Sequence, residues 1–337
     1  MNTGSIVFLA SSAFIAAAAA TGGLTQLLSK GGILAHPSSR GSHQVPTPVG
    51  GGIAIYVVLV TAWGAIALTE PAAPDEMGWI LLCSLALAIP SWMDDLTGLP
   101  WVPRLILQIV TASIGTILLN APLPVFQGLL PYALDLPATV FLWVGFVNLF
   151  NFTDGIDGNA GTKATALGVG MFLLALLGAI PVVLGELGLT AAAAAAGFLL
   201  WNWHPARIFM GDVGSVPLGF LFAWLLLSMA GHGQWAPAVI LPLVYLSDTG
   251  LTYLVKIARR ERFWYTHKDH YYQRAVTRDG ITHAQVVKVV LVGDVMMIIM
   301  ALLSTQGFLW WALLGAALAS VAVLAYLDLG LKGLPES

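Results

Sequence analysis

The chain has 337 residues, of which 58% are hydrophobic and only 9% are charged. A soluble domain carries about 25% charged residues, so 14 Lys or Arg and 17 Asp or Glu are too few to cover a soluble protein of this length. High hydrophobicity also excludes intrinsic disorder. A net charge of -3, with no basic run longer than Arg259-Arg260, argues against nucleic-acid binding. The single Cys83 has no partner for an intrachain disulfide. A polytopic membrane protein remains.

Apolar segments that approach the length of a membrane span recur along the whole chain. A spanning helix needs about 20 mostly apolar residues. Eleven segments come close to this: 5–28, 48–69, 78–93, 104–120, 137–152, 163–180, 187–203, 216–230, 235–257, 285–304 and 308–328. We therefore predict an all-α polytopic membrane bundle of about 11 transmembrane helices. No linker or internal repeat divides it, so residues 1–337 are interpreted as a single integral-membrane domain.

The few charges are distributed unequally between the predicted loops. All 14 Lys and Arg fall on one side of the predicted membrane, whereas Glu70, Asp75, Glu76, Asp135 and Glu186 lie on the other. The positive-inside rule makes the basic side cytoplasmic. The N-terminus is then outside and the C-terminus is cytoplasmic, which an odd number of spans satisfies. The first span has no basic residue before it, so a cleaved signal peptide is the poorer interpretation.

The first polar cluster on the cytoplasmic side is Asp94-Asp95, at the end of a predicted span. Adjacent carboxylates repel each other and favour a bound cation. A pair of solvated loop acids explains them about equally well. Arg104 and Gln108 lie one helical turn apart on the next predicted helix and could face a phosphate.

The second cluster runs from Asn148 to Asn159 and directly follows an apolar helix. Asn148, Asn151 and Asp154 are spaced by three residues, so they share one helical face if the helix continues. Glycines after Asp154 and Asp157 allow a ligand to approach the backbone closely. Helix packing alone is a poor explanation for so many polar residues here, and we expect a functional site.

Two glycine-containing loops are individually weaker signals. In Phe209–Ser215, Asp212 lies between glycines, which suits a metal or phosphate contact but also an ordinary turn. Arg40 and His43 precede Thr47–Gly52, where three glycines open a helix. That segment is an anion site at a helix N-terminus or a tight turn with small packing residues, with no preference between the two.

The longest cytoplasmic loop contains His267 and His270, which could bind metal, contact phosphate or lie on an interfacial amphipathic helix. Asp248 and Asp294 fall within predicted spans. A carboxylate near the bilayer centre costs on the order of 2.5–3.5 kcal/mol, so both should face the bundle interior. Asp248 is the better functional candidate, because it precedes the basic loop. A neutral Asp294 could serve helix packing.

Together, the order and spacing of these clusters resemble the polyprenyl-phosphate N-acetylhexosamine-1-phosphate transferase family. The acidic pair of that family matches Asp94-Asp95, and its Asn-x-x-Asn-x-x-Asp-Gly-x-Asp-Gly signature matches Asn148–Gly158 in full. Its Phe-x-Gly-Asp-x-Gly-Ser signature matches Phe209–Ser215, and its Thr-Pro-x-Gly-Gly element matches Thr47–Gly51. The resemblance covers nearly the whole chain.

The departures from the family pattern point to one branch. The peptidoglycan and enterobacterial GlcNAc branches usually carry His-x-His-His where this chain has His270-Tyr271-Tyr272-Gln273. This form resembles the WbpL-type branch, which initiates O-antigen or exopolysaccharide chains. Ala35 and Val49 stand where the family often has Asp and Arg, which affects nucleotide-sugar recognition more than the reaction class.

The resemblance implies the reaction and its participants. The enzyme would transfer N-acetylhexosamine-1-phosphate from a UDP-sugar to undecaprenyl phosphate and release UMP, as the initiating step of lipopolysaccharide O-antigen or exopolysaccharide synthesis. The implied cofactor is Mg²⁺, for which Mn²⁺ could substitute. The implied location is the bacterial inner membrane, with the active site facing the cytoplasm and no nucleic-acid partner. Whether the chain forms a homodimer is left open.

The resemblance also assigns roles to individual residues. The implied catalytic residues are Asp94, Asp95, Asp154 and His270. The implied substrate-binding residues are Arg40, His43, Arg104, Asn148, Asp157, Asn159, Phe209 and Arg274. The implied metal ligands are Asn151 and Asp212. Asp157 would contact uracil, Phe209 would stack on the base, and Asp94 or Asp95 would position or deprotonate the lipid phosphate.

Three alternatives are weaker. A transporter would distribute acidic residues through the spans and use both membrane faces. A CDP-alcohol phosphotransferase needs Asp-Gly-x-x-Ala-Arg, whereas Ile-Asp-Gly-Asn follows Asp154-Gly155. Phospho-N-acetylmuramoyl-pentapeptide transferase, within the same family, is disfavoured by the missing histidine pair.

Overall fold

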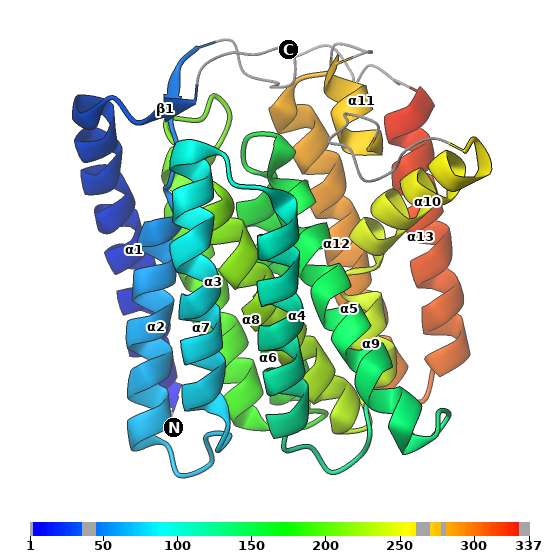
Figure 1. Cartoon of the computed structure of the whole chain (residues 1–337). Helices are drawn as coiled ribbons and strands as arrows, with labels where there is room; N and C mark the ends of the chain where they lie inside the picture. Colours follow the sequence, from blue (N-terminus) through cyan, green and yellow to red (C-terminus); the bar gives the residue numbers. More distant parts are fainter. Residues whose placement is uncertain (1–2, 36–44, 261–269, 278–280, 330–337) are drawn as a thin grey trace.

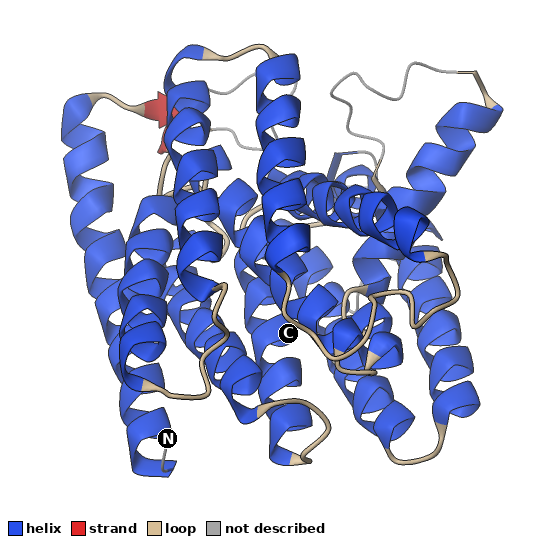
Figure 2. Cartoon of the chain, turned by 60° about the horizontal axis from the view of Figure 1, so that its bottom comes forward, coloured by secondary structure: helices blue, strands red, loops and turns tan. Residues whose placement is uncertain are grey.

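The computed structural model describes residues 3–35, 45–260, 270–277 and 281–329. These residues are almost entirely helical (Figure 2). The long helices are α1 (Thr3–Gly31), α2 (Gly52–Thr69), α3 (Met77–Thr97), α4 (Trp101–Leu118), α5 (Tyr132–Phe152), α6 (Asn159–Leu176), α7 (Val182–Asn202), α8 (Asp212–Gly231), α10 (Leu243–Ala258), α12 (His283–Thr305) and α13 (Leu309–Leu329). The short ones are η1 (Thr153–Gly155), α9 (Trp235–Ile240) and α11 (Tyr271–Thr277).

The all-α membrane bundle is confirmed, but the number of spans is not. Within the described ranges, nine helices are long and apolar enough to cross a membrane. The predicted span 163–180 corresponds to α6, which is not among the nine. The predicted continuous helix 235–257 is wrong, because it is broken between α9 and α10 at Leu241-Pro242. Proline has no N–H for the helical ladder, and Pro242 stands directly before α10.

The helices run up and down the bundle, with α1 beginning at its lower end and α13 ending at its upper end (Figure 1). Helix α8 lies at the centre and packs against α2, α3, α5 and α9. Large side chains such as Trp63, Trp143 and Trp224 fill the interior, while Trp310 and Trp311 are exposed on the outside. Because lipid tails are as apolar as these side chains, close packing holds such an interior together.

A small strand pair and two close-packed glycines fix the upper end. Strand β1 (Leu34–Ala35) pairs antiparallel with β2 (Thr47–Pro48), and Val49 bridges to Phe209. A Cβ on Gly52 would lie 2.2 Å from the Gly214 Cα, so the first turns of α2 and α8 touch backbone to backbone. Only glycine permits this approach. The Thr47–Gly52 segment is thereby held against the loop that contains Asp212.

Candidate active site

A cavity of about 1530 Å³ lies among α4, α5, α8, α9 and α10. One part of its lining is polar, with side chains from five separate segments: Asp95, Arg104, Asn148, Asn151, Asp154, Asp212 and His270. The remainder is largely apolar and includes Phe141, Leu142, Phe146, Leu226, Leu227 and Val239. The cavity therefore joins an ionic site to an apolar surface formed by the bundle helices.

Four acids from three segments that are distant in the sequence converge at the polar part. We call Asp94, Asp95, Asp154 and Asp212 the carboxylate cluster. Arg104 Nη1 donates to Asp212 Oδ2 at 2.6 Å and also to Asp94 Oδ2. One guanidinium thus links α4, the end of α3 and the start of α8. The sequence led us to expect that Arg104 faces a phosphate. In the structure it lines the cavity, and its partners are carboxylates.

Asp95 fixes the start of α8. Its Oδ1 accepts the Asp212 N–H at 2.9 Å and its Oδ2 accepts the Val213 N–H at 3.0 Å. These N–H groups are orphans of the first helical turn, and a carboxylate there is also favoured by the helix dipole. Gly211 has φ 75°, and a Cβ on it would lie 2.6 Å from Asp95 Oδ2. The glycine of the Gly-Asp motif is therefore required for this contact.

The donor set of the carboxylate cluster fits a Mg²⁺ ion. Asn151 Nδ2 donates to Asp212 Oδ1 and to Ser215 Oγ, each at 2.8 Å, so its amide oxygen is the atom left to accept or ligate. Asp154 lies beside Gly211 and feels the charges of Asp212 and Asp95. Carboxylate and amide oxygens, with one arginine among four acids, suit a hard cation that prefers oxygen ligands.

His270 lines the cavity, and Asp248 holds the segment that carries it. Asp248 Oδ1 accepts the Tyr271 N–H at 2.9 Å and lies 3.5 Å from His270 Nδ1, while Asp248 Oδ2 accepts the Tyr272 N–H at 3.4 Å. The Tyr272 hydroxyl donates to the Phe152 carbonyl. Burial raises the pKa of Tyr272 well above its usual value, so this hydroxyl stays a donor. Asp248 thus anchors the start of α11 beside the cavity.

Both acids predicted to face the bundle interior do so, since Asp248 is 7% exposed and Asp294 is 2% exposed. Asp294 Oδ2 accepts a hydrogen bond from the Tyr245 hydroxyl at 3.4 Å. The ammonium of Lys163 lies over the Tyr245 ring. Asp294 is therefore a packing residue next to a buried cation, away from the cavity lining.

The remaining predicted residues divide into those that line the cavity and those that do not. Asn148 lines it and donates to Gln108 Oε1 at 2.7 Å. Phe209 lines it, and its carbonyl accepts the Gly51 N–H at 2.8 Å. Asn159 is buried away from the lining, and its Nδ2 donates to the Thr153 carbonyl at 2.8 Å.

Arg274 is not among the lining residues. Its Nη2 donates to Asp328 Oδ1 at 2.7 Å, and its guanidinium lies 4.4 Å from the centre of the Tyr271 ring. Two further predicted residues, Arg40 and His43, lie outside the described residues.

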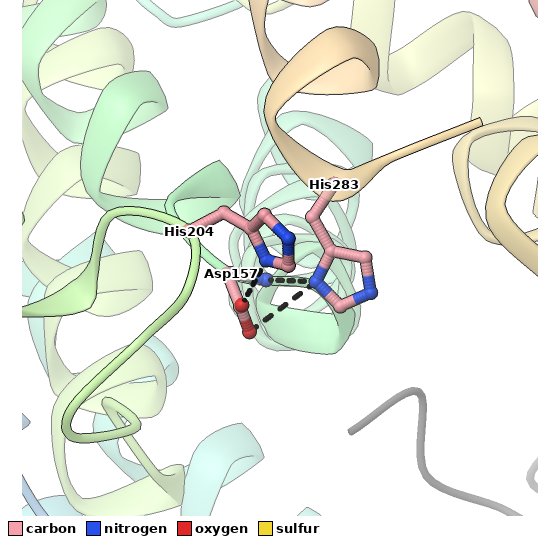
Figure 3. A group of neighbouring side chains, drawn as sticks. All are labelled: Asp157, His204 and His283. Atoms are coloured by element: carbon pink, nitrogen blue, oxygen red, sulfur yellow. Dashed lines mark hydrogen bonds and ion pairs between the residues drawn. The ribbon is translucent and has the colours of Figure 1, made fainter. Parts of the chain in front are cut away.

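Asp157 differs from the acids of the carboxylate cluster because it has two imidazole partners (Figure 3). We call Asp157, His204 and His283 the histidine cluster. Asp157 Oδ2 lies 2.6 Å from His204 Nδ1 and accepts the Ala206 N–H at 3.1 Å. Burial opposes the charge on Asp157, but hydrogen bonds with His283 and His204 hold its pKa below the usual value. The cluster thus contains a carboxylate.

Sequence reasoning missed His204 and His283 as partners of Asp157. His204 follows α7 in the loop that leads to Phe209, and His283 is the first residue of α12. The Thr282 hydroxyl caps that helix, in a capping box with Gln285. Both histidines lie at the ends of predicted spans, on the side that was predicted to be cytoplasmic. This position was the only signal in the sequence that could have linked them to the site.

Comparison with protein families gives the class of this site. Residues 77–230 match the model of glycosyl transferase family 4. The matched segment runs from α3 to α8 and contains the whole carboxylate cluster. This part of the chain is therefore similar to glycosyl transferase family 4.

Several curated proteins are similar to the chain. A probable undecaprenyl-phosphate N-acetylglucosaminyl 1-phosphate transferase of Bacillus subtilis is 25% identical over 84% of this chain and 80% of its own length. A decaprenyl-phosphate N-acetylglucosaminephosphotransferase of Mycobacterium tuberculosis is 32% identical, and the match covers 63% of this chain and 57% of the relative. A phospho-N-acetylmuramoyl-pentapeptide-transferase of Streptococcus pneumoniae is 30% identical over 60% of this chain and 65% of the relative. The chain thus spans less than two thirds of the latter two relatives.

Proposed function

We propose that this protein is a polyprenyl-phosphate sugar-1-phosphate transferase. It transfers N-acetylhexosamine-1-phosphate from a UDP-sugar to undecaprenyl phosphate and releases UMP. The observation that carries this proposal is the cavity, in which four carboxylates and one arginine adjoin an apolar surface. A diphosphate needs cationic partners, and a polyprenyl chain needs apolar contact at membrane depth. The relatives from Bacillus and Mycobacterium, which act on the same kinds of substrate by name, support it.

The roles of the residues follow from where they lie. Phosphoryl transfer depends on positioning and charge stabilisation more than on covalent chemistry. Mg²⁺, held by Asp212 and Asn151, would neutralise charge on the diphosphate when bound. Arg104, which now donates to Asp94 and Asp212, would contact phosphate oxygens after exchanging one of these carboxylate partners. His270, held by Asp248, presents its ring to the same part of the cavity.

The two adjacent acids have different tasks in this proposal. Both oxygens of Asp95 are engaged with the start of α8, so Asp95 positions Asp212. Asp94 is held by Arg104 and the Leu99 N–H, and it lies where Arg104 would meet phosphate. Asp94 therefore orients the attacking lipid phosphate. A phosphate monoester with a second pKa near about 6 is mostly dianionic at neutral pH, so orientation outweighs proton removal.

The finer assignments belong to the same proposal. The N-terminus is outside, the C-terminus is cytoplasmic, and the cavity's polar part faces the cytoplasm, because every Lys and Arg falls on that predicted side. Residues 1–337 act as one transferase unit. Phe209 stacks on the uracil ring, and Asp157 accepts a hydrogen bond from the uracil. The pathway is initiation of O-antigen or exopolysaccharide synthesis, as the WbpL-like His270–Gln273 segment suggests.

A peptidoglycan transferase is the second candidate, and the streptococcal relatives favour it. The residues that replace the family's histidine pair argue against it. Tyr272 is buried and bonded to the Phe152 carbonyl, and Gln273 lines the cavity. Neither side chain supplies the imidazole that this branch usually carries.

The test uses the purified full-length protein with undecaprenyl phosphate, Mg²⁺ and a panel of UDP-sugars that includes the muramoyl-pentapeptide donor. We expect UMP release with a UDP-N-acetylhexosamine and none with the muramoyl-pentapeptide donor. Release only with the muramoyl-pentapeptide donor would favour the second candidate. Asp94→Asn should insert normally and release little UMP. Asp75→Asn, an exposed acid before α3, is the matched control. No UMP from any donor would overturn the proposed function.

A further inference from the structure

The histidine cluster is assembled from three segments that meet only in the tertiary structure. Asp157 follows η1, His204 lies in the loop after α7, and His283 begins α12. One ligand atom from each residue lies within 4.8 Å of the others. The side chains of Asp157 and His283 are 9% and 7% exposed, whereas that of His204 is 35% exposed. The cluster is therefore enclosed at Asp157 and His283 and open to solvent at His204.

One contact within the cluster cannot be satisfied by protons. The Asp157 N–H donates to His283 Nδ1 at 3.2 Å, which requires a lone pair on that nitrogen. The same Nδ1 lies 3.3 Å from Asp157 Oδ1, so its lone pair faces a carboxylate oxygen. A proton on Nδ1 would repair the second contact but would then oppose the backbone N–H. Either protonation state leaves one mismatched contact, and such a mismatch in a buried site is costly.

A metal ion bound by His283 Nδ1 and Asp157 Oδ1 would turn the contact between these two atoms into two ligand bonds to one cation. The ion would take the single lone pair of Nδ1, so the Asp157 N–H would have to turn away from that nitrogen. Two ligands about 2.1 Å from a tetrahedral metal are separated by about 3.4 Å. The observed separation of Nδ1 and Oδ1 is 3.3 Å. His204 Nδ1, at 2.6 Å from Asp157 Oδ2, would lose its bridging proton and move outward to become the third ligand.

We propose that Asp157, His204 and His283 bind a divalent transition-metal ion of the zinc type, at a site separate from the Mg²⁺ site of the carboxylate cluster. Two imidazole nitrogens and one carboxylate suit zinc-like ions better than Mg²⁺, which prefers oxygen ligands. Water would occupy the fourth position, on the side where His204 is exposed. The ion would fasten the loops after η1 and α7 to the start of α12.

The site is compatible with the nucleobase contact proposed for Asp157. A carboxylate that binds metal through one oxygen keeps the other as an acceptor, and Asp157 lines the cavity. The proposal does not depend on the transferase reaction, however. Metal content can be measured in the absence of any substrate. A failure of the metal proposal can therefore be distinguished from a failure of the proposed function.

The test measures zinc bound to the purified full-length protein. Protein stripped with a chelator is incubated with Zn²⁺, desalted and analysed for metal by mass spectrometry. We expect one ion per chain in the native protein and none above background in the His204→Ala, His283→Ala double variant. With Co²⁺ as the probe, visible absorption bands of a tetrahedral nitrogen and oxygen site should appear in the native protein and vanish in the double variant.

Matched controls separate this site from other histidines and from misfolding. His232→Ala removes a histidine that hydrogen-bonds to the Ser228 carbonyl after α8, and it should keep the full zinc content. Asp212→Asn should also keep it, because Asp212 belongs to the carboxylate cluster. If the double variant misfolds, His283→Gln provides the comparison. Equal zinc content in the native protein and in a folded cluster variant would overturn the proposal.

Discussion

The carboxylate cluster and the histidine cluster both use the connections from α5 to α6 and from α7 to α8, yet they differ in what neutralises their acids. In the carboxylate cluster, Asp95 is held by backbone N–H groups, and Asp94 and Asp212 share one arginine. In the histidine cluster, a single acid meets two imidazoles. The first set offers mainly oxygen ligands and the second adds nitrogen. The comparison teaches that ligand chemistry, more than the number of acids, distinguishes the two proposed cation sites.

The largest effect is expected from Asp212→Asn. Removing this ligand should lower UMP release by at least about 100-fold, on the scale of losing one preorganised electrostatic group. The zinc content of the histidine cluster should not change, and the two are measured on the same preparation. Near-normal UMP release would remove Asp212 from the proposed Mg²⁺ site, and a parallel loss of zinc would merge the two clusters.

Chelation followed by metal replacement separates the clusters without mutation. We expect a chelator to abolish UMP release and Mg²⁺ alone to restore it, because Asp212 and Asn151 offer oxygen ligands. Activity is followed while Mg²⁺, Mn²⁺ and Zn²⁺ are added back singly. Full restoration by Zn²⁺ alone would contradict the division between the two sites.

Asp248→Asn tests the positioning of His270. An amide keeps one acceptor for the Tyr271 N–H but loses the charge beside the imidazole, so kcat/KM should fall by roughly 10-fold. The effect should be much smaller in a His270→Asn background, since the two residues act through one group. Steady-state kinetics of both single variants and the double variant measure this. Additive losses would show that Asp248 acts elsewhere.

Asp95→Ala distinguishes positioning from chemistry within the acidic pair. It removes acceptors for the first two N–H groups of α8, which costs about 1 kcal/mol by analogy with lost helix caps. We expect a lower melting temperature together with reduced turnover. Asp94→Asn should reduce turnover at an unchanged melting temperature, and a thermal scan of both variants is the check. An unshifted melting temperature for Asp95→Ala would contradict its capping role.

The smallest effect is expected from Arg274→Lys. The ion pair of Arg274 with Asp328 is partly exposed and lies off the cavity lining. Such pairs contribute about 1 kcal/mol or less. KM for the UDP-sugar should therefore remain within about threefold of the native value. A large rise in KM, not reproduced by Asp328→Ala, would return Arg274 to the substrate site that the family resemblance assigns to it.

Part of the candidate site was accessible from the sequence because its signals are local. Asp94-Asp95, Asn151 and Asp212 each follow an apolar helix or open one, and polar residues there are not needed for packing. The structure brings Asn151 and Asp212 within 2.8 Å of each other. The contacts of Asp157 with His204 and His283 were not accessible, because neither histidine carries a local pattern and the contacts join separate helices.

The break in the predicted span 235–257 and the placement of Arg274 have the same origin. Hydropathy averages over Leu241-Pro242, so it could not separate α9 from α10. Spacing placed Arg274 near His270 along the chain, but it could not tell that Asp328 of α13 would bind it.

The sequence by itself determined that the chain is a membrane protein of many helices and that its polar clusters lie at helix ends. Burial in lipid permits few charges, so each retained charge is informative. Only the tertiary structure decided what those charges do. The residues next to Asp95 and Asp248 in the sequence do not reveal their partners, yet Asp95 caps α8 and Asp248 anchors α11. Hydrogen bonds act over about 3 Å, so their partners depend on which helix ends meet, and helix packing sets that.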